Sequence, residues 1–214
     1  MAAQETILTD IIEAIARKLI DAEKTLTELD SMGDADCGSG VRRGFEAVIG
    51  SIGEISRLDI GEMLKKVGFT LAYTIGGTSG AMLGTGFIET GKSIGDNRQP
   101  GLADWANALD KALSVIKRRG GNTQVGDKTF VDSLEPAVAT MKALLESGQE
   151  ISAGKFLEGA YEAAKIGSDR TIEMIARKGR ASYVGERSRG SRDPGSLIIV
   201  LIFEAAIETF RRHQ

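Results

Sequence analysis

The chain has 214 residues, a formal net charge of −3, 42% hydrophobic and 5% aromatic residues, and three prolines. This length allows one large or two small domains, and the composition excludes a disordered chain and argues against an all-β sandwich. The slight negative charge gives no reason to expect nucleic acid or a membrane surface as a partner.

The predicted elements are all helices. Apolar residues at every fourth position from Ile7 to Leu19 predict a first helix over about residues 5–29. The same periodicity predicts helices over residues 41–52, 60–73, 81–94, 102–117 and 130–146, one or two helices over 153–176, and a last helix of about 16 residues that begins near Leu197. Glycine-rich or polar segments between them are predicted to be loops, namely residues 30–40, 75–80, 95–101, 120–126 and 178–195.

No segment alternates apolar and polar residues with period two, so the sequence predicts an all-α chain. About eight helices joined by short loops favour antiparallel neighbours in a single-domain barrel or bundle that comprises residues 1–214. In such an up-and-down arrangement, every second loop lies at the same end. We therefore expect four glycine-rich loops to meet there: residues 30–40, 76–80, 120–129 and 178–195.

Residues 29–40, LDSMGDADCGSG, place Asp30, Asp34 and Asp36 within seven positions, with no basic residue among them. Carboxylates this close repel one another unless a cation lies between them. Carboxylate oxygens in a flexible turn are the ligands that Mg²⁺ and Ca²⁺ prefer, so the turn is a candidate metal site. A solvated acidic turn after a helix is the alternative. An EF-hand is excluded, because position 12 counted from either of the first two aspartates holds Val41 or Phe45 instead of glutamate.

Two other glycine-rich segments contain groups that bind phosphate. Residues 76–80, GGTSG, precede a helix whose free N–H groups, with the hydroxyls of Thr78 and Ser79, form a candidate phosphate site. A simple turn that one of these side chains caps is the alternative. Residues 178–195 carry basic side chains that suit phosphate oxygens or an acidic partner, although a solvated loop has the same composition. These side chains are Lys178, Arg180, Arg187, Arg189 and Arg192.

Residues 86–93, GFIETGKS, match the P-loop pattern G-x-x-x-x-G-K-[ST]. The P-loop mechanism needs a strand before the motif and a helix after it. Here the motif lies inside the helix predicted over residues 81–94 and a loop follows it, so we interpret the match as incidental. On this interpretation Gly91 or Gly95 ends the helix, and Lys92 lies near its last carbonyl groups.

Together, carboxylates for Mg²⁺, turns for phosphate and a basic segment predict a metal–nucleotide site. Phosphoryl transfer requires positioning and charge neutralisation more than covalent catalysis. The only histidine is His213, next to the C-terminal residue, so Ser-His-Asp and Cys-His catalysis by an internal histidine are excluded. Phosphoryl transfer, which needs no such histidine, suits this chain. Cys37 is the only cysteine, which excludes an internal disulfide and favours a cytoplasmic location. No apolar run reaches the ~18 residues of a membrane span.

These motifs resemble the L subunit of dihydroxyacetone kinase, the nucleotide-binding part of that enzyme. The matching stretches occur in the same order as in the family and span nearly the whole chain. The longest of them is specific to this family, which argues against a chance match. The matching stretches are residues 29–36 (LDSMGDAD), 76–80 (GGTSG), 126–129 (GDKT), 176–188 (ARKGRASYVGERS) and 193–195 (DPG). The resemblance implies a barrel of eight antiparallel helices with ADP or ATP at one end, held through two Mg²⁺ ions.

When the functional residues of the family are transferred to the matching motifs of this chain, the resemblance implies that Asp30, Asp34 and Asp36 are the metal ligands. It places Arg180 both in the nucleotide pocket and in catalysis. The other nucleotide-binding residues that it implies are Cys37, Gly38, Ser39, Gly40, Thr78, Ser79, Gly120, Phe130, Asp193, Pro194 and Gly195. The chain departs from the family pattern at three places: the first two aspartates are four residues apart where five is usual, Cys37 replaces a frequent histidine, and the loop after Gly120 is one residue longer.

The resemblance also implies partners. A separate K subunit would bind the ketone covalently through its own histidine, so we expect the chain to be a kinase subunit that is inactive alone. The ketone is dihydroxyacetone or another triose or tetrose. The phosphoryl donor is either free ATP or a phosphotransferase-system protein that rephosphorylates bound ADP, and the residues leave both open. The alternative function is a nucleotide-dependent regulatory module that docks on a transcription regulator. The oligomeric state, a homodimer included, is also left open.

Overall fold

The computed structural model describes residues 4–214 and confirms the all-α prediction, since this part of the chain contains ten α-helices, three short 3₁₀-helices and no strand. The eight long helices are α1 (Gln4–Asp21), α3 (Cys37–Gly50), α5 (Ile60–Thr74), α6 (Gly77–Ile94), α7 (Leu102–Arg119), α8 (Val131–Glu146), α9 (Ala153–Arg170) and α10 (Pro194–Arg212). Two short helices, α2 (Glu23–Leu29) and α4 (Ile52–Ile55), extend or connect them. Within residues 4–214, no helix is both long and apolar enough to cross a bilayer.

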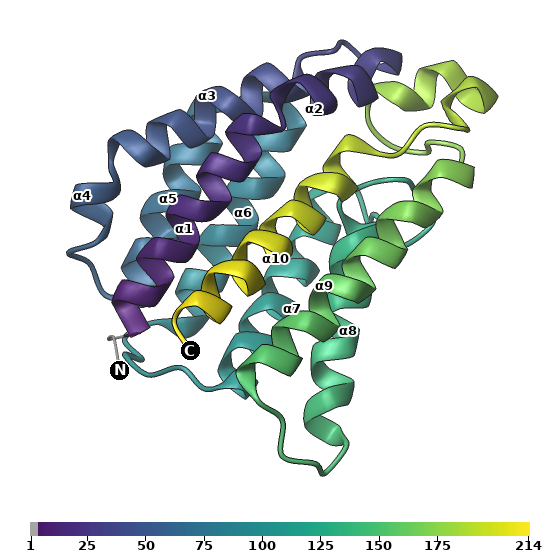
Figure 1. Cartoon of the computed structure of the whole chain (residues 1–214). Helices are drawn as coiled ribbons and strands as arrows, with labels where there is room; N and C mark the ends of the chain where they lie inside the picture. Colours follow the sequence, from purple (N-terminus) through teal and green to yellow (C-terminus); the bar gives the residue numbers. More distant parts are fainter. Residues whose placement is uncertain (1–3) are drawn as a thin grey trace.

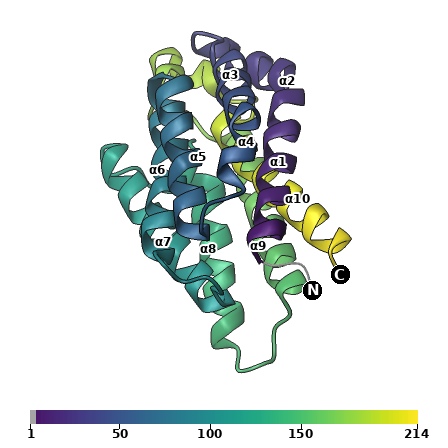
Figure 2. The same cartoon turned by 90° about the vertical axis from the view of Figure 1, so that its left-hand side faces the viewer.

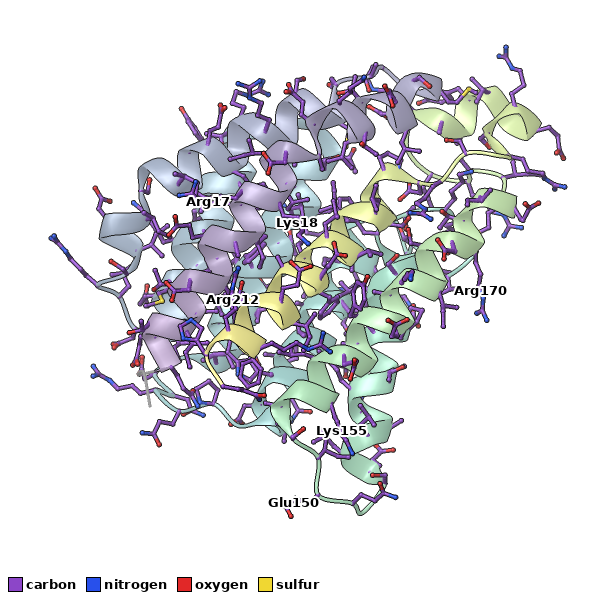
Figure 3. The ribbon with its side chains drawn as sticks, in the orientation of Figure 1. Arg17, Lys18, Glu150, Lys155, Arg170 and Arg212 are labelled. Atoms are coloured by element: carbon purple, nitrogen blue, oxygen red, sulfur yellow. The ribbon has the colours of Figure 1, made fainter. Side chains whose placement is uncertain are left out.

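The eight long helices form a closed ring. From α1 through α3 and α5 to α10, each helix packs on the next long helix in the chain, and α10 packs back on α1. Figures 1 and 2 show the start of α1 and the end of α10 near each other at one end of this ring. Lys18, labelled in Figure 3, joins the first and last helices through ion pairs with Glu204 (2.9 Å) and Glu208 (2.8 Å). The predicted barrel of about eight antiparallel helices is therefore confirmed.

Two of the predicted boundaries are wrong by more than a few residues. The helix predicted over residues 5–29 is broken at Ala22, which separates α1 from α2. The segment 178–195, predicted to be a loop, contains the 3₁₀-helix η3 (Arg180–Ser188) and the first residues of α10. A kink at Gly185, where φ is +56°, interrupts η3, and glycine adopts this left-handed backbone without a steric penalty.

Helix α6 contains the P-loop-like residues 86–93, so the interpretation of this motif as part of a helix is confirmed. Its glycines allow α6 to pack closely on α5, because a Cβ on Gly91 would lie 2.5 Å from the carbonyl oxygen of Gly61. Lys92 forms a surface ion pair with Glu89 (2.7 Å). Gly91 of the motif thus serves the packing of α6 on α5.

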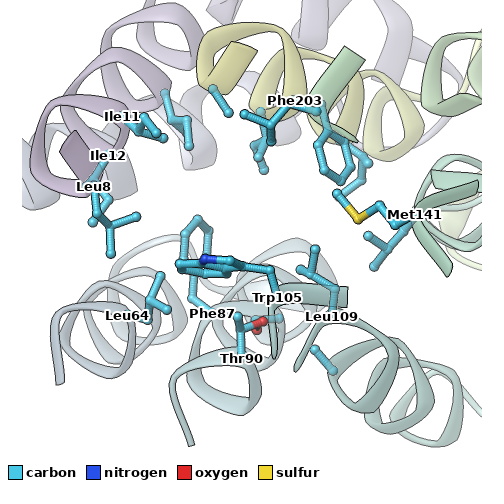
Figure 4. A pocket seen from close by; sticks show the side chains of 18 of the residues that line it. Leu8, Ile11, Ile12, Leu64, Phe87, Thr90, Trp105, Leu109, Met141 and Phe203 are labelled. Carbon is cyan, nitrogen blue, oxygen red and sulfur yellow. Dashed lines mark hydrogen bonds between the residues drawn. The ribbon is translucent and has the colours of Figure 1, made fainter. Parts of the chain in front are cut away.

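The apolar faces of the helices fill the interior of the ring but leave a cavity of about 330 Å³. Figure 4 shows side chains from opposite walls, among them Leu8, Trp105 and Phe203, that face one another across it. Among residues 4–214, no acidic or basic side chain lines the cavity. It is therefore distinct from the carboxylate cluster that the sequence predicts, although the ring of Phe130 forms part of its wall.

Candidate metal–nucleotide site

The four glycine-rich loops lie together at one end of the barrel, as predicted. In Figure 1 the turn that follows α2 lies beside η3 at this end. The acidic turn meets the turn between α5 and α6 where Cys37 Sγ lies 3.9 Å from Ser79 Oγ. The segment after α9 meets the loop between α7 and α8, because the backbone N–H of Arg177 donates to the carbonyl oxygen of Asp127 (3.1 Å).

Asp30, Asp34 and Asp36 converge in the turn between α2 and α3. One carboxylate oxygen of each lies within 4.8 Å of the other two. The side chain of Asp30 accepts a hydrogen bond from the backbone N–H of Cys37 (3.1 Å), which ties this carboxylate to the start of α3. Ala35 adopts a φ of +56°, which is uncommon for a residue with a Cβ. The short spacing between the first two aspartates therefore does not keep Asp30 out of the cluster.

The electrostatics of the cluster fit a cation. Burial raises the pKa of Asp30, and the nearby charges of Asp34 and Asp36 raise it further. A divalent cation among the three carboxylates would relieve this repulsion, and carboxylate oxygens are the donors that Mg²⁺ takes. Arg180 already reaches the cluster, because its Nε lies 2.7 Å from Asp34 Oδ2. The basic segment and the acidic turn thus form one site.

The first turn of α3 supplies residues 37–40 of the predicted site. Cys37 and Gly38 are buried, and a Cβ on Gly38 would lie 2.1 Å from the carbonyl oxygen of Glu23. Gly38 is therefore required for the close packing of α3 on α2. Burial raises the pKa of the Cys37 thiol to about 12, so this thiol stays protonated at neutral pH. Ser39 is exposed beside the carboxylates.

Gly76, in the turn between α5 and α6, and Gly77, the first residue of α6, have φ values of +77° and +55°, which only glycine adopts readily. Gly76 is the N-cap of α6, and no side chain caps the first N–H groups of this helix. The alternative in which Thr78 or Ser79 is the N-cap is therefore wrong. Both hydroxyls lie in the first turn of α6, and Thr78 is exposed.

The residues that begin α10 pack against the start of α8. Asp193 is the N-cap of α10, and its carboxylate accepts a hydrogen bond from the backbone N–H of Ser196 (2.6 Å). The residue as a whole is partly exposed, but burial of its carboxyl group raises the pKa of Asp193 to about 7. Pro194 occupies the first position of the helix, where its missing N–H leaves no bond unmade. A Cβ on Gly195 would lie 3.1 Å from the ring of Phe130.

Burial divides the predicted nucleotide-binding residues into two sets. The buried ones are Cys37, Gly38, Gly40, Phe130 and Gly195. The exposed or partly exposed ones are Ser39, Thr78, Ser79, Gly120, Arg180, Asp193 and Pro194. The second set presents hydroxyl, guanidinium and backbone groups at the end of the barrel that holds the carboxylates, and its role in binding stays a prediction.

Sequence reasoning did not single out Lys128, in the loop between α7 and α8, and Asp132, in the first turn of α8, although both are buried and charged. The carboxylate of Asp132 accepts hydrogen bonds from the backbone N–H groups of Gly126 and Thr129, both at 2.6 Å, and so closes this loop on itself. Lys128 donates to three backbone carbonyl groups of residues 174–191. The only sequence signal was the short GDKT motif, which does not indicate that its lysine is buried.

Comparison with known proteins places this chain in a family. Residues 31–208 match the family model of the DAK2 domain. The ADP-binding subunit DhaL of the PEP-dependent dihydroxyacetone kinase from Escherichia coli strain K12 is 39% identical over 181 residues, which cover 84% of each of the two chains.

Two solved structures share the fold. The native form of the dihydroxyacetone kinase of C. freundii matches with a TM-score of 0.74 and 25% identity. The complex of the C. freundii kinase with AMP-PNP and Mg²⁺ matches with a TM-score of 0.71 and 23% identity. Each match covers 95% of the present chain and 34% of the kinase chain, so the present chain corresponds to about a third of that kinase.

Proposed function

The chain belongs to the DAK2 domain family, and we propose that it is the nucleotide-binding subunit of a dihydroxyacetone-type kinase. In this role it holds ADP or ATP with Mg²⁺ and delivers a phosphoryl group to a triose or tetrose ketone on a separate K-type subunit. The observation that carries the proposal is the convergence of Asp30, Asp34 and Asp36 where four glycine-rich loops meet.

The three carboxylates are proposed to hold two Mg²⁺ ions. Each carboxylate offers two oxygens, and Mg²⁺ completes its coordination with phosphate and water oxygens. Bound Mg²⁺ would neutralise phosphate charge during phosphoryl transfer. Asp30 is held in place by its bond from the N–H of Cys37, whereas Asp34 and Asp36 are exposed residues, of which Asp34 pairs with Arg180.

Arg180 is proposed to contact the transferred phosphoryl group. Only its Nε pairs with Asp34, and the side chain is 68% exposed, so its remaining N–H donors face solvent or ligand. A guanidinium group binds phosphate oxygens in a two-pronged geometry. The hydroxyls of Thr78 and Ser79 and the uncapped N–H groups of α6 lie at the same end of the barrel and are proposed to bind the remaining phosphates.

The acceptor ketone requires a second protein in this proposal. His213, the only histidine, pairs with Asp10 (2.9 Å) at the opposite end of the barrel from the carboxylates. It therefore has no access to a ketone at the nucleotide site. A K-type subunit that carries its own histidine would supply the acceptor, and a cytoplasmic location follows from this role as a prediction.

The decisive experiment measures phosphorylation of dihydroxyacetone and of erythrulose by the chain alone, by a K-type subunit alone and by the mixture. Each is assayed once with Mg-ATP and once with ADP plus a phosphotransferase-system donor. We expect product only in the mixture, and the active donor identifies the branch of the family. Robust turnover by the isolated chain would contradict the two-component proposal. Mg-nucleotide binding without transfer in any mixture would favour the regulatory module instead.

A further inference from the structure

Lys128 has an unusual environment for a lysine. The residue is only 5% exposed, although an ammonium group loses much of its hydration when it is buried. Its Nζ donates to the backbone carbonyl oxygens of Met174 (3.1 Å), Ser191 (2.6 Å) and Ser188. An ammonium group has three N–H donors, so these three carbonyl groups satisfy it completely. The charge is therefore held by backbone dipoles.

The three carbonyl groups belong to the two ends of one segment, residues 174–191, which contains η3 and Arg180. Met174 follows the 3₁₀-helix η2 (Thr171–Glu173), which comes directly after α9, and Ser188 and Ser191 lie where the chain returns toward α10. Lys128, from a different loop, thus joins the outgoing and the returning chain. Lys128 therefore closes the base of this segment. Arg180, whose guanidinium contacts Asp34, lies in the same segment away from this base.

Two further bonds hold this segment: the N–H of Arg177 donates to the carbonyl oxygen of Asp127 (3.1 Å), and the N–H of Ala176 donates to Ser188 Oγ (2.8 Å). The links that the other charged side chains of the segment make to the barrel are exposed. Lys178 donates to the carbonyl oxygen of Gly121 (2.9 Å), and Arg180 pairs with Asp34, both in contact with water. Exposed charged pairs contribute little to holding a chain in one conformation. Lys128 also keeps a φ of +63°, a backbone conformation that costs free energy in a residue with a Cβ. The surrounding fold maintains this backbone conformation. The conformation directs the ammonium group of Lys128 toward the base of the segment.

We propose that Lys128 is a positioning residue for phosphoryl transfer: by closing the base of residues 174–191, it fixes the place of the Arg180 guanidinium over the nucleotide site. The inference rests on the proposed function, because Arg180 acts on phosphate there. Buried charged groups contribute little net stability compared with apolar side chains, and they serve in some proteins to select one conformation. Lys128 selects the conformation of this segment.

The first test needs no activity. Lys128→Met removes the ammonium group but keeps the length of the side chain, and Lys142→Met on the surface of α8 is the matched control. Trypsin cleaves exposed arginines such as Arg187 and Arg189. We expect cleavage within residues 174–191 to be at least tenfold faster in Lys128→Met and unchanged in the control. An unchanged cleavage rate in folded Lys128→Met overturns the proposal.

The second test separates positioning from stability. Single-turnover transfer from bound Mg-ATP to dihydroxyacetone on a K-type subunit should slow at least tenfold in Lys128→Met. The affinity for Mg-ADP should change less than threefold, because the carboxylates are intact. In an Arg180→Ala background, Lys128→Met should cause no further loss of rate, since it acts through that arginine. An equal loss in both backgrounds overturns the proposal.

The two proposals fail in distinguishable ways. A wild-type chain that transfers nothing contradicts the proposed function and with it the catalytic part of this inference, whereas unchanged trypsin cleavage contradicts this inference alone. If Lys128→Met does not fold, Lys128→Arg replaces it. The planar guanidinium does not match three acceptors arranged around an ammonium group, so faster cleavage and slower transfer are again expected. Wild-type behaviour of Lys128→Arg in both assays overturns the proposal.

Discussion

Asp34 and Asp36 are exposed, so their side chains can be changed with little effect on packing. We predict that Asp34→Asn and Asp36→Asn each weaken binding of Mg-ADP at least tenfold, about 1.4 kcal/mol. The reason is that an amide is neutral and is a poorer ligand for Mg²⁺ than a carboxylate. Titration calorimetry with and without Mg²⁺ measures the change.

Lys92→Ala is the control for these two variants. Lys92 lies on the surface of α6 and pairs with Glu89, so its removal should leave the affinity within about twofold. A large loss of affinity in Lys92→Ala would mean that the P-loop-like motif binds nucleotide. Unchanged affinity in both aspartate variants would refute the proposed metal site.

Asp193 should make the stability of the chain depend on pH. Burial raises its pKa from the ordinary 3.8 to about 7 in the folded chain. The folded state therefore binds this proton more tightly than the unfolded state, and the resulting stability is lost as the pH rises through about 7. We predict that wild type loses stability relative to Asp193→Asn between about pH 4 and about pH 8. Urea unfolding without nucleotide measures this difference, and a constant difference would contradict the prediction.

Helix α3 contains two glycines in opposite environments. A Cβ on Gly38 would lie 2.1 Å from the carbonyl oxygen of Glu23, whereas nothing lies within 4 Å of a Cβ on Gly50. We predict that Gly38→Ala destabilises the chain by roughly 2 kcal/mol or more, because α3 must move away from α2. Gly50→Ala should stabilise it by up to about 1 kcal/mol, because alanine loses less entropy in a helix.

Urea unfolding compares these two glycine variants. Gly38→Ala should also weaken Mg-ADP binding, since the movement of α3 displaces the N–H of Cys37 that holds Asp30. Equal stability of the two variants would mean that the contact between α2 and α3 relaxes freely and does not set the shape of the acidic turn.

The proposed ligand would contact several loops of the barrel at once, namely those before α3, α6, α8 and α10. Its binding should therefore stabilise the whole molecule. A ligand that binds only the folded state stabilises it by about 2.7 kcal/mol at 100 times its dissociation constant. We predict that Mg-ADP at this ratio raises Tm by roughly 5 to 10 °C for a chain of this size. ADP with EDTA at the same concentration should raise it far less. Equal stabilisation with and without Mg²⁺, measured by scanning calorimetry, would contradict a metal-dependent site.

Features that depend on nearby residues were predictable from the sequence alone. The apolar periodicity of each helix repeats within a few turns, so the all-α fold and most boundaries followed from it. Asp30, Asp34 and Asp36 lie within seven positions, so their convergence also followed from their spacing, and the helical nature of residues 86–93 followed from their neighbours. The break at Ala22 was missed because the apolar pattern continues across it.

Features that join distant segments depended on the packing of the ring. Arg180 meets Asp34 because α10 packs back on α1, which brings the segment before α10 beside the acidic turn. Lys128 meets the two ends of residues 174–191 because α8 packs on α9, so that the loop before α8 and the segment after α9 lie at the same end. No local pattern states which backbone carbonyl groups a lysine will contact. The apolar faces likewise predicted a common interior but not its cavity of about 330 Å³, because that volume depends on how far apart eight helices stand once the ring is closed.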